Sequence, residues 1–215
     1  MLSIDHFATF FGEVHQRDPF PWQSALLRRV VQSGWPAGID VPTGLGKTSV
    51  LDVAVFAAAL GVPHARRRIF YVVDRRLIVD EAYEHARRIA SALEKPVGEV
   101  TMKVAQRLRA EDDDVTLDVT RMRGGVTWER TWLERPDRHA IVTGTVDQVG
   151  SRLFFRGYGV SERARPIDAA LVGTDSLIVI DEAHVAPAFV TTVRSAFELD
   201  DSALAPRPLG GPISP

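Results

Sequence analysis

The fold is decided by Val41-Pro42-Thr43-Gly44-Leu45-Gly46-Lys47-Thr48, a Gly-rich turn that precedes a strongly apolar stretch. Gly44 and Gly46 allow a tight turn whose backbone N–H groups can face a phosphate. A helix that begins here would add its positive N-terminal end. Lys47 would provide a mobile cation for the β- and γ-phosphates of a nucleoside triphosphate, and Thr48 a hydroxyl for Mg²⁺. The pattern predicts a phosphate-binding loop.

The loop departs from the strict G-x-x-x-x-G-K-[ST] pattern, because Val41 stands where that pattern has its first Gly. The elements on either side support the assignment, since a short strand is predicted over residues 38–41 and a helix over residues 48–60. The candidate nucleotide-binding residues of the loop are Thr43, Gly44, Leu45, Gly46, Lys47, Thr48 and Ser49.

A second motif, Asp181-Glu182-Ala183-His184, directly follows an apolar run over residues 177–180 that predicts a strand. Because Asp181 follows this strand, its carboxylate is expected at the carboxyl edge of the sheet. Ligands of open α/β folds bind at that edge, so Asp181 would hold Mg²⁺ together with Thr48. Glu182 would polarise the attacking water, and His184 would couple the site to neighbouring motifs. The candidate catalytic residues are therefore Lys47, Asp181, Glu182 and His184.

Apolar runs and helical patterns alternate along the chain. Further strands are predicted over residues 69–73, 115–119, 140–143 and 177–180, and an amphipathic helix over residues 77–93. Such alternation implies right-handed crossovers, and hence an α/β fold with a mostly parallel central sheet and helices on both faces.

The chain is expected to divide into three parts. Residues 1–36 form a helical N-terminal segment, residues 37–200 the nucleotide-binding domain, and residues 201–215 a Pro- and Gly-rich disordered tail or truncated linker. Within the domain, Glu111-Asp112-Asp113-Asp114 is interpreted as a solvated acidic loop.

Composition excludes several classes of protein. The absence of Cys rules out disulfides, zinc knuckles and a thiol nucleophile, and the six His are scattered in the sequence, so no dedicated metal cluster is assigned. The formal net charge of −2 means that any nucleic-acid contact needs a local basic face. No signal peptide and no apolar run long enough for a bilayer are visible, which predicts a cytoplasmic protein without membrane contact.

Taken together, these residues resemble superfamily 2 DEAH-box helicases, and in particular the helicase part of the CRISPR-associated helicase–nuclease of type I systems. The resemblance covers roughly residues 15–195 and implies a first RecA-like domain that binds ATP and Mg²⁺. Phe20-Pro21-Trp22-Gln23 lies where that superfamily has an adenine-reading Gln, so Gln23 would contact the adenine edge. An ordinary surface Gln is the alternative.

The same resemblance implies contacts with a nucleic-acid backbone at three turns. Arg75 and Arg76 follow the strand over residues 69–73. Arg123, Gly124 and Gly125 match a paired-Gly motif. The third turn is a Thr-Gly-x motif made of Thr143, Gly144 and Thr145. Backbone contacts of this kind are blind to base sequence.

The family implies single-stranded DNA as the track and recruitment by an RNA-guided CRISPR surveillance complex. A second RecA-like domain and a nuclease domain, which the family also needs, are not found in the sequence, so a poorly active fragment is expected. Alternatives are a free-standing RecA-like binding module, or part of another motor such as a restriction translocase or an RNA helicase.

Overall fold

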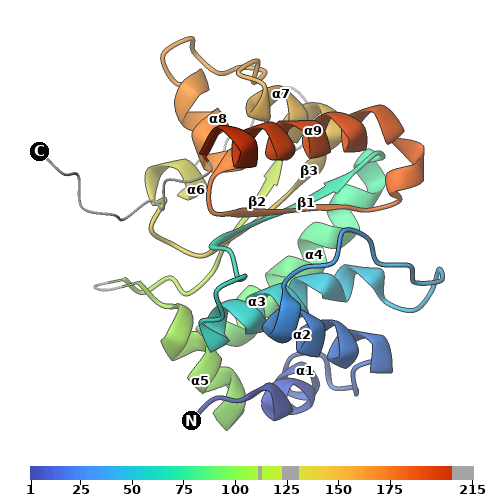
Figure 1. Ribbon diagram of the computed structural model, residues 1–215. Coiled ribbons are helices and arrows are strands. Elements are labelled where there is room, and N and C mark those ends of the chain that lie inside the picture. Colours follow the sequence, from blue (N-terminus) through green and yellow to red (C-terminus); the bar gives the residue numbers. More distant parts are fainter. Residues whose placement is uncertain (111–112, 123–130, 205–215) are drawn as a thin grey trace, which may run out of the picture. The chain divides into compact units, whose positions relative to one another are not determined.

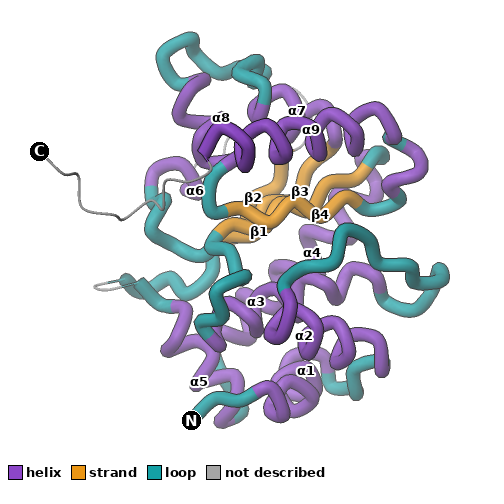
Figure 2. The backbone as a smooth tube through the Cα atoms, in the orientation of Figure 1, coloured by secondary structure: helices purple, strands orange, loops and turns teal. Residues whose placement is uncertain are grey.

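The apolar runs form one four-stranded sheet in the computed structural model, which describes residues 1–110, 113–122 and 131–204. The strands are β1 (Arg68–Val73), β2 (Asp118–Met122), β3 (Ala140–Thr145) and β4 (Ser176–Ile180). Their order is β2-β3-β1-β4, and every neighbouring pair is parallel (Figure 2). The predicted α/β fold with a parallel sheet is thereby confirmed.

Helices cover both faces of the sheet (Figure 1). One face carries α1 (Phe7–His15), α2 (Pro21–Ser33), α3 (Val50–Leu60), α4 (Arg76–Glu94) and α5 (Glu99–Leu108), and the other carries α6 (Thr131–Glu134), α7 (Val146–Leu153) and α8 (Arg165–Gly173). The connection from β1 to β2 and the connection from β3 to β4 step in opposite directions along the sheet. Right-handed crossovers therefore place their helices on opposite faces.

The side chains of β1 alternate between these two layers. Ile69, Tyr71 and Val73 belong to the main apolar core with the helices of the first face. Phe70 points the other way and packs edge-on against Trp132 of α6, with ring centroids 5.7 Å apart. Burial on both faces explains why β1 reads as a continuous apolar run in the sequence.

Residues 1–36, predicted to be helical, contain the two helices α1 and α2. Phe7 and Phe10 of α1 pack on Phe56 of α3, with ring centroids 5.5 and 5.3 Å apart. The second helix buries Leu26, Leu27 and Val30 and ends at Gly34. This segment is therefore part of the domain core.

The strand predicted over residues 38–41 is wrong, because these residues adopt no regular structure. Only two apolar side chains alternate there, and Ile39 remains 42% exposed. In the sheet, β1 pairs directly with β4. A short run that leaves one of its two apolar residues in solvent lacks the two-sided burial of a central parallel strand.

Two other expectations need correction. The strand predicted over residues 115–119 lies at Asp118–Met122, where Met122 is buried opposite Gly144. The helix α5 was not predicted, although Val100, Val104 and Leu108 recur along one buried side of it. Its first turn is capped by Glu13 of α1, whose carboxylate accepts hydrogen bonds from the backbone N–H and the hydroxyl of Thr101 at 2.7 and 2.6 Å.

The acidic run is not simply a solvated loop. The Asp113 side chain is only 3% exposed and accepts hydrogen bonds from the guanidinium of Arg138, one of them at 2.7 Å. Arg135 approaches the same carboxylate at 2.8 Å. The hydrogen bond from Arg138, followed by one from the Val115 backbone, lowers the Asp113 pKa to about 2. Of the other residues of the run, Asp114 is exposed, and 111–112 lie outside the described residues.

The chain separates into a first unit, Met1–Asp181, and a second that begins at Glu182. The second unit contains the short 3₁₀ helix η3 (Ala183–Val185) and the long helix α9 (Pro187–Leu204). The first four residues of the predicted tail are thus helical, and residues 205–215 lie outside the described part. No described helix is long and apolar enough to cross a bilayer.

Candidate nucleotide-binding site

The phosphate loop is a turn that leads through η2 (Lys47–Ser49) into α3. Gly44 and Gly46 have φ angles of 87° and 67°, in the left-handed region that a side chain would strain. Gly46 caps η2 and accepts a hydrogen bond from the Ser49 N–H at 3.0 Å. These two glycines therefore adopt the tight turn that the sequence predicted.

Four N–H groups of the loop make no hydrogen bond to the backbone in the described structure. Within the described part of the chain, none of the following residues donates its N–H to a backbone carbonyl: Gly44, Gly46, Lys47 and Thr48. Thr43, Gly44 and Leu45 are exposed, and Lys47 and Thr48 are half-buried. Successive free N–H groups at the start of a helix are what a phosphate group requires.

The carbonyls of the loop are held by α2. The indole Nε1–H of Trp22 donates to the Leu45 carbonyl at 2.9 Å, and the amide Nε2 of Gln23 lies 3.5 Å from the Gly46 carbonyl. Because side chains of α2 bind these two carbonyls, the loop is held in place through its carbonyl oxygens. Sequence reasoning missed Trp22. The available signal was its indole N–H, a donor that needs a hydrogen-bond partner.

Gln23 is fully buried in this structure. Its Oε1 accepts a hydrogen bond from the Phe20 N–H at 2.9 Å, which closes the first turn of α2. The structure brings Gln23 to the phosphate loop and presents it as a support of that loop. It is not the ordinary surface Gln that was considered as an alternative.

Ser49, counted among the nucleotide-binding candidates, is 1% exposed, and its Oγ has no hydrogen-bond partner in the described structure. A buried hydroxyl without a partner is uncommon. It lies in the last residue of η2, directly beside the half-buried Thr48.

Asp181 directly follows β4, where its backbone N–H donates to the Val72 carbonyl at 2.9 Å. Its carboxylate accepts a hydrogen bond of 2.8 Å from the Tyr71 hydroxyl of β1. The carboxylate is half-buried and stands at the carboxyl end of the strand, as the sequence predicted. Tyr71 is a further residue that sequence reasoning missed.

Glu182 and His184 belong to the second unit and are exposed. Glu182 caps η3 with a φ angle of 49°, an unusual conformation for a residue with a long side chain. Conformations of this kind gather at functional sites.

The candidate nucleic-acid residues differ in accessibility. Arg75 is exposed at the start of α4, whereas Thr143 is fully buried inside β3 and Thr145 is 8% exposed at the start of α7. A Cβ at Gly144 would lie 3.1 Å from Met122, so this strand admits little more than Gly there. The side chain of Arg76 and all of Arg123, Gly124 and Gly125 lie outside the described residues.

Two of the scattered histidines contact the same carboxylate, that of Asp52, which is fully buried in the first turn of α3. One carboxylate oxygen lies 2.6 Å from Nε2 of His15 in α1, and the other lies 2.7 Å from Nε2 of His85 in α4. The rings stack with centroids 4.8 Å apart. Burial alone would raise the Asp52 pKa, but the two imidazole hydrogen bonds outweigh it and lower the pKa.

The rings face the carboxylate through their Nε2 atoms. The His15 side chain is 1% exposed, and its Nδ1 has no hydrogen-bond partner in the described structure. The Nε2 atoms and the carboxylate are the donor types of a metal site and lie within 4.8 Å of one another. Their short contacts, however, are those of a hydrogen-bond network. This network connects α3, the helix after the phosphate loop, to α1 and α4.

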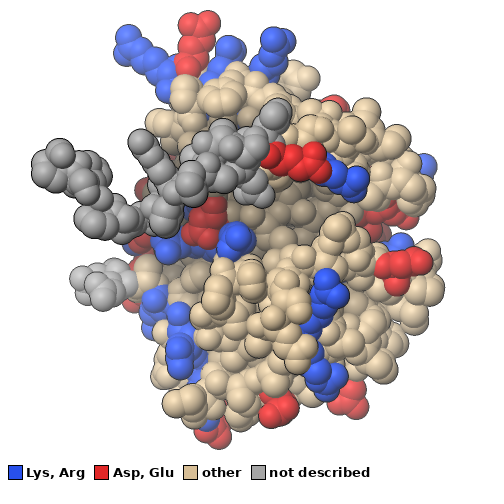
Figure 3. Space-filling model, in the orientation of Figure 1, with Lys and Arg blue, Asp and Glu red and all other residues tan. Residues whose placement is uncertain are grey.

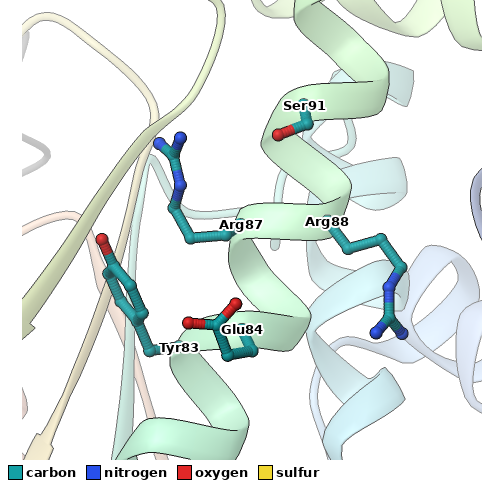
Figure 4. Close-up of a pocket in the computed structure, with 5 residues that line it drawn as sticks. All are labelled: Tyr83, Glu84, Arg87, Arg88 and Ser91. Atoms are coloured by element: carbon teal, nitrogen blue, oxygen red, sulfur yellow. The ribbon is translucent and has the colours of Figure 1, made fainter.

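A separate pocket lies on α4, lined by Tyr83, Glu84, Arg87, Arg88 and Ser91. In Figure 4, Tyr83 and Arg87 point to one side of the helix and Arg88 to the other. Nearby, the Arg121 guanidinium lies 4.8 Å from the centre of the Tyr83 ring and pairs with Asp80 at 3.0 Å. None of these residues belongs to the phosphate loop or the acidic box, so this pocket is distinct from the nucleotide site.

A helix-flanked parallel sheet, a Gly-rich loop that opens a helix, and a carboxylate after a strand define a RecA-like P-loop domain. In a comparison with protein families, residues 17–203 match the model of the type III restriction enzyme, res subunit. The chain belongs to this family, and it is a helicase-like module of an ATP-dependent nucleic-acid motor. No match was found among curated proteins or among solved structures.

Proposed function

We propose that this chain is the first RecA-like half of a DNA helicase or translocase, which binds ATP·Mg²⁺ and couples its hydrolysis to movement on single-stranded DNA. The observation that carries the proposal is the phosphate loop itself. In the described structure the N–H groups of Gly44, Gly46, Lys47 and Thr48 make no backbone hydrogen bond, and α2 holds two carbonyls of the loop. That arrangement selects an anionic ligand rich in acceptor oxygens.

Each site residue then has a distinct task. Lys47 neutralises the β- and γ-phosphates, Thr48 and Asp181 hold the metal, and Glu182 orients the attacking water. Bound Mg²⁺ would neutralise charge that develops on the phosphates. Tyr71 keeps the Asp181 carboxylate in place through its 2.8 Å hydrogen bond. The half-buried hydroxyl of Thr48 and the carboxylate of Asp181 are oxygen donors, which fit Mg²⁺.

Movement requires more than this half. In motors of this class a second RecA-like domain supplies arginine fingers, whose contribution to the rate is about 10³–10⁵-fold. We therefore propose that this chain binds nucleotide alone but turns it over slowly, and that a second RecA-like domain accelerates the reaction. The resemblance in residues 15–195 supports CRISPR interference as the setting, with a nuclease domain and an RNA-guided surveillance complex as partners.

The proposal is tested by binding a fluorescent ATP analogue in the presence and absence of Mg²⁺. Replacing Lys47 by Ala should abolish measurable binding, and Asp181→Asn should remove the dependence on Mg²⁺ while leaving weak Mg²⁺-free binding. Lys95→Ala is the matched control, because Lys95 is exposed at the far end of α4. Equal affinity in wild type and Lys47→Ala would refute the phosphate loop.

A restriction translocase is the second candidate, and it is favoured by the description of the matching family. The two candidates differ in their nucleic-acid track. Stimulation of ATP hydrolysis by single-stranded DNA over duplex DNA and RNA supports the first proposal, whereas a preference for duplex DNA supports the second.

A further inference from the structure

The connection between α7 and α8 exposes three aromatic side chains close together in the sequence. Phe155 and Tyr158 are each 58% exposed and Phe154 is 37% exposed. By contrast, Phe10 and Phe56 are completely buried in the core. Aromatic rings gain most of their stabilisation from burial, so adjacent rings left in solvent indicate a surface that binds something.

Backbone hydrogen bonds hold this connection in a defined shape. The N–H of Phe154 donates to the Gly150 carbonyl at 3.1 Å, and that of Phe155 to the Arg152 carbonyl at 3.0 Å. At its base, Arg152 of α7 and Asp168 of α8 form a buried ion pair at 3.3 Å. The rings are therefore presented from a fixed support.

Two positions show that the loop has a demanding geometry. A Cβ at Gly157 would lie 2.8 Å from Val160, which leaves room only for glycine. Phe155 has a φ angle of 61°, which is unfavourable for a bulky side chain. An exposed ring in a strained conformation is better explained by binding than by folding.

Basic side chains accompany the rings. Arg156 is exposed between Phe155 and Tyr158, and Arg163 is exposed further along, with Glu162 as the one acidic residue of the segment 154–164. Figure 3 shows Lys and Arg side chains around the α7–α8 connection, at the top of the view, with an acidic side chain among them. Rings that alternate with guanidinium groups suit a ligand with flat apolar faces and an anionic backbone.

We propose that residues 154–163 form a stacking surface for single-stranded nucleic acid. Bases stack on Phe155 and Tyr158, and phosphates pair with Arg156 and Arg163. This inference rests on the proposed function and adds a contact outside the three turns that the resemblance implies. The helix α7 begins directly after the Thr-Gly-x motif of β3, so the two regions are consecutive in the chain.

The test is fluorescence anisotropy of a labelled 20-nucleotide oligo-dT at moderate salt, without ATP. Phe155→Ala and Tyr158→Ala should each weaken binding about tenfold, since stacking of one base accounts for roughly that factor or more. Tyr158→Phe keeps the ring and should bind as wild type does. Arg156→Gln should weaken binding and reduce its salt dependence.

Phe197→Ala is the control, because it removes a partly exposed ring that does not belong to residues 154–163. The thermal unfolding of every variant should equal that of wild type, which shows that the fold is intact. If wild type binds the oligonucleotide and the two alanine variants bind it equally well, the stacking surface is refuted and the loop becomes a protein-docking surface. If wild type binds ATP·Mg²⁺ but no nucleic acid, the nucleic-acid part of the proposed function fails as well.

Discussion

The Tyr71 hydroxyl donates a hydrogen bond of 2.8 Å to the Asp181 carboxylate, so a residue in the middle of β1 holds the acidic group that directly follows β4. Tyr71 is 1% exposed and belongs to the main core, which fixes its ring. A carboxylate with a rigid partner loses less freedom when it binds a metal, because its orientation is already set.

Tyr71→Phe should therefore increase the Mg²⁺ concentration needed for nucleotide binding by about tenfold, the usual effect of removing a support of a metal ligand. Nucleotide binding without Mg²⁺ should not change. Titrating Mg²⁺ against the fluorescent ATP analogue measures both quantities. Tyr83→Phe on α4 removes a comparable hydroxyl away from the site and should have no effect.

Trp22→Phe should weaken nucleotide binding about fivefold, because it removes one hydrogen bond worth about 1 kcal/mol from the Leu45 carbonyl while keeping an aromatic ring. Isothermal titration with ATP·Mg²⁺ measures the effect. Trp35→Phe is its counterpart, since the Trp35 indole donates to the His64 carbonyl at 3.1 Å outside the phosphate loop. A similar loss of affinity in both variants would contradict a specific role for Trp22.

Asp52→Ala should lower the free energy of unfolding by about 3–5 kcal/mol, since it leaves two histidines near the core without the carboxylate that pairs with them. Urea denaturation followed by circular dichroism measures this change. Asp18 is exposed, so Asp18→Ala should change stability by less than about 0.5 kcal/mol. A small effect at Asp52 would show that the cluster does not anchor α3.

The sequence predicted the parallel sheet and its main helices because their signals are local. Continuous apolar runs predicted β1, β3 and β4, and Gly44 and Gly46 predicted the turn of the phosphate loop. The missing strand over residues 38–41 shows the limit of such reasoning. Whether a short run joins a sheet depends on neighbours that are distant in the sequence, and here β1 pairs directly with β4 instead.

The supports of the site could not be predicted for the same reason. Trp22 reaches Leu45, and Tyr71 reaches Asp181, across long stretches of sequence, and no periodicity links either pair. The Asp52 cluster joins three helices in the same way. Candidate binding and catalytic residues can be predicted from sequence motifs. The side chains that position them can be identified only from the folded structure.

Asp113 gives a prediction for pH, because its pKa of about 2 lies below the ordinary value of 3.8. The folded state therefore releases this proton more readily than the unfolded state does. The resulting stabilisation is fully present above about pH 4 and is lost as the pH falls through about 2. Wild type should lose stability over this interval more steeply than Asp113→Asn, in which the position no longer titrates. Measuring the thermal midpoint of both proteins between pH 5 and pH 2 decides the matter, and parallel curves would show that Arg138 contributes nothing through this carboxylate.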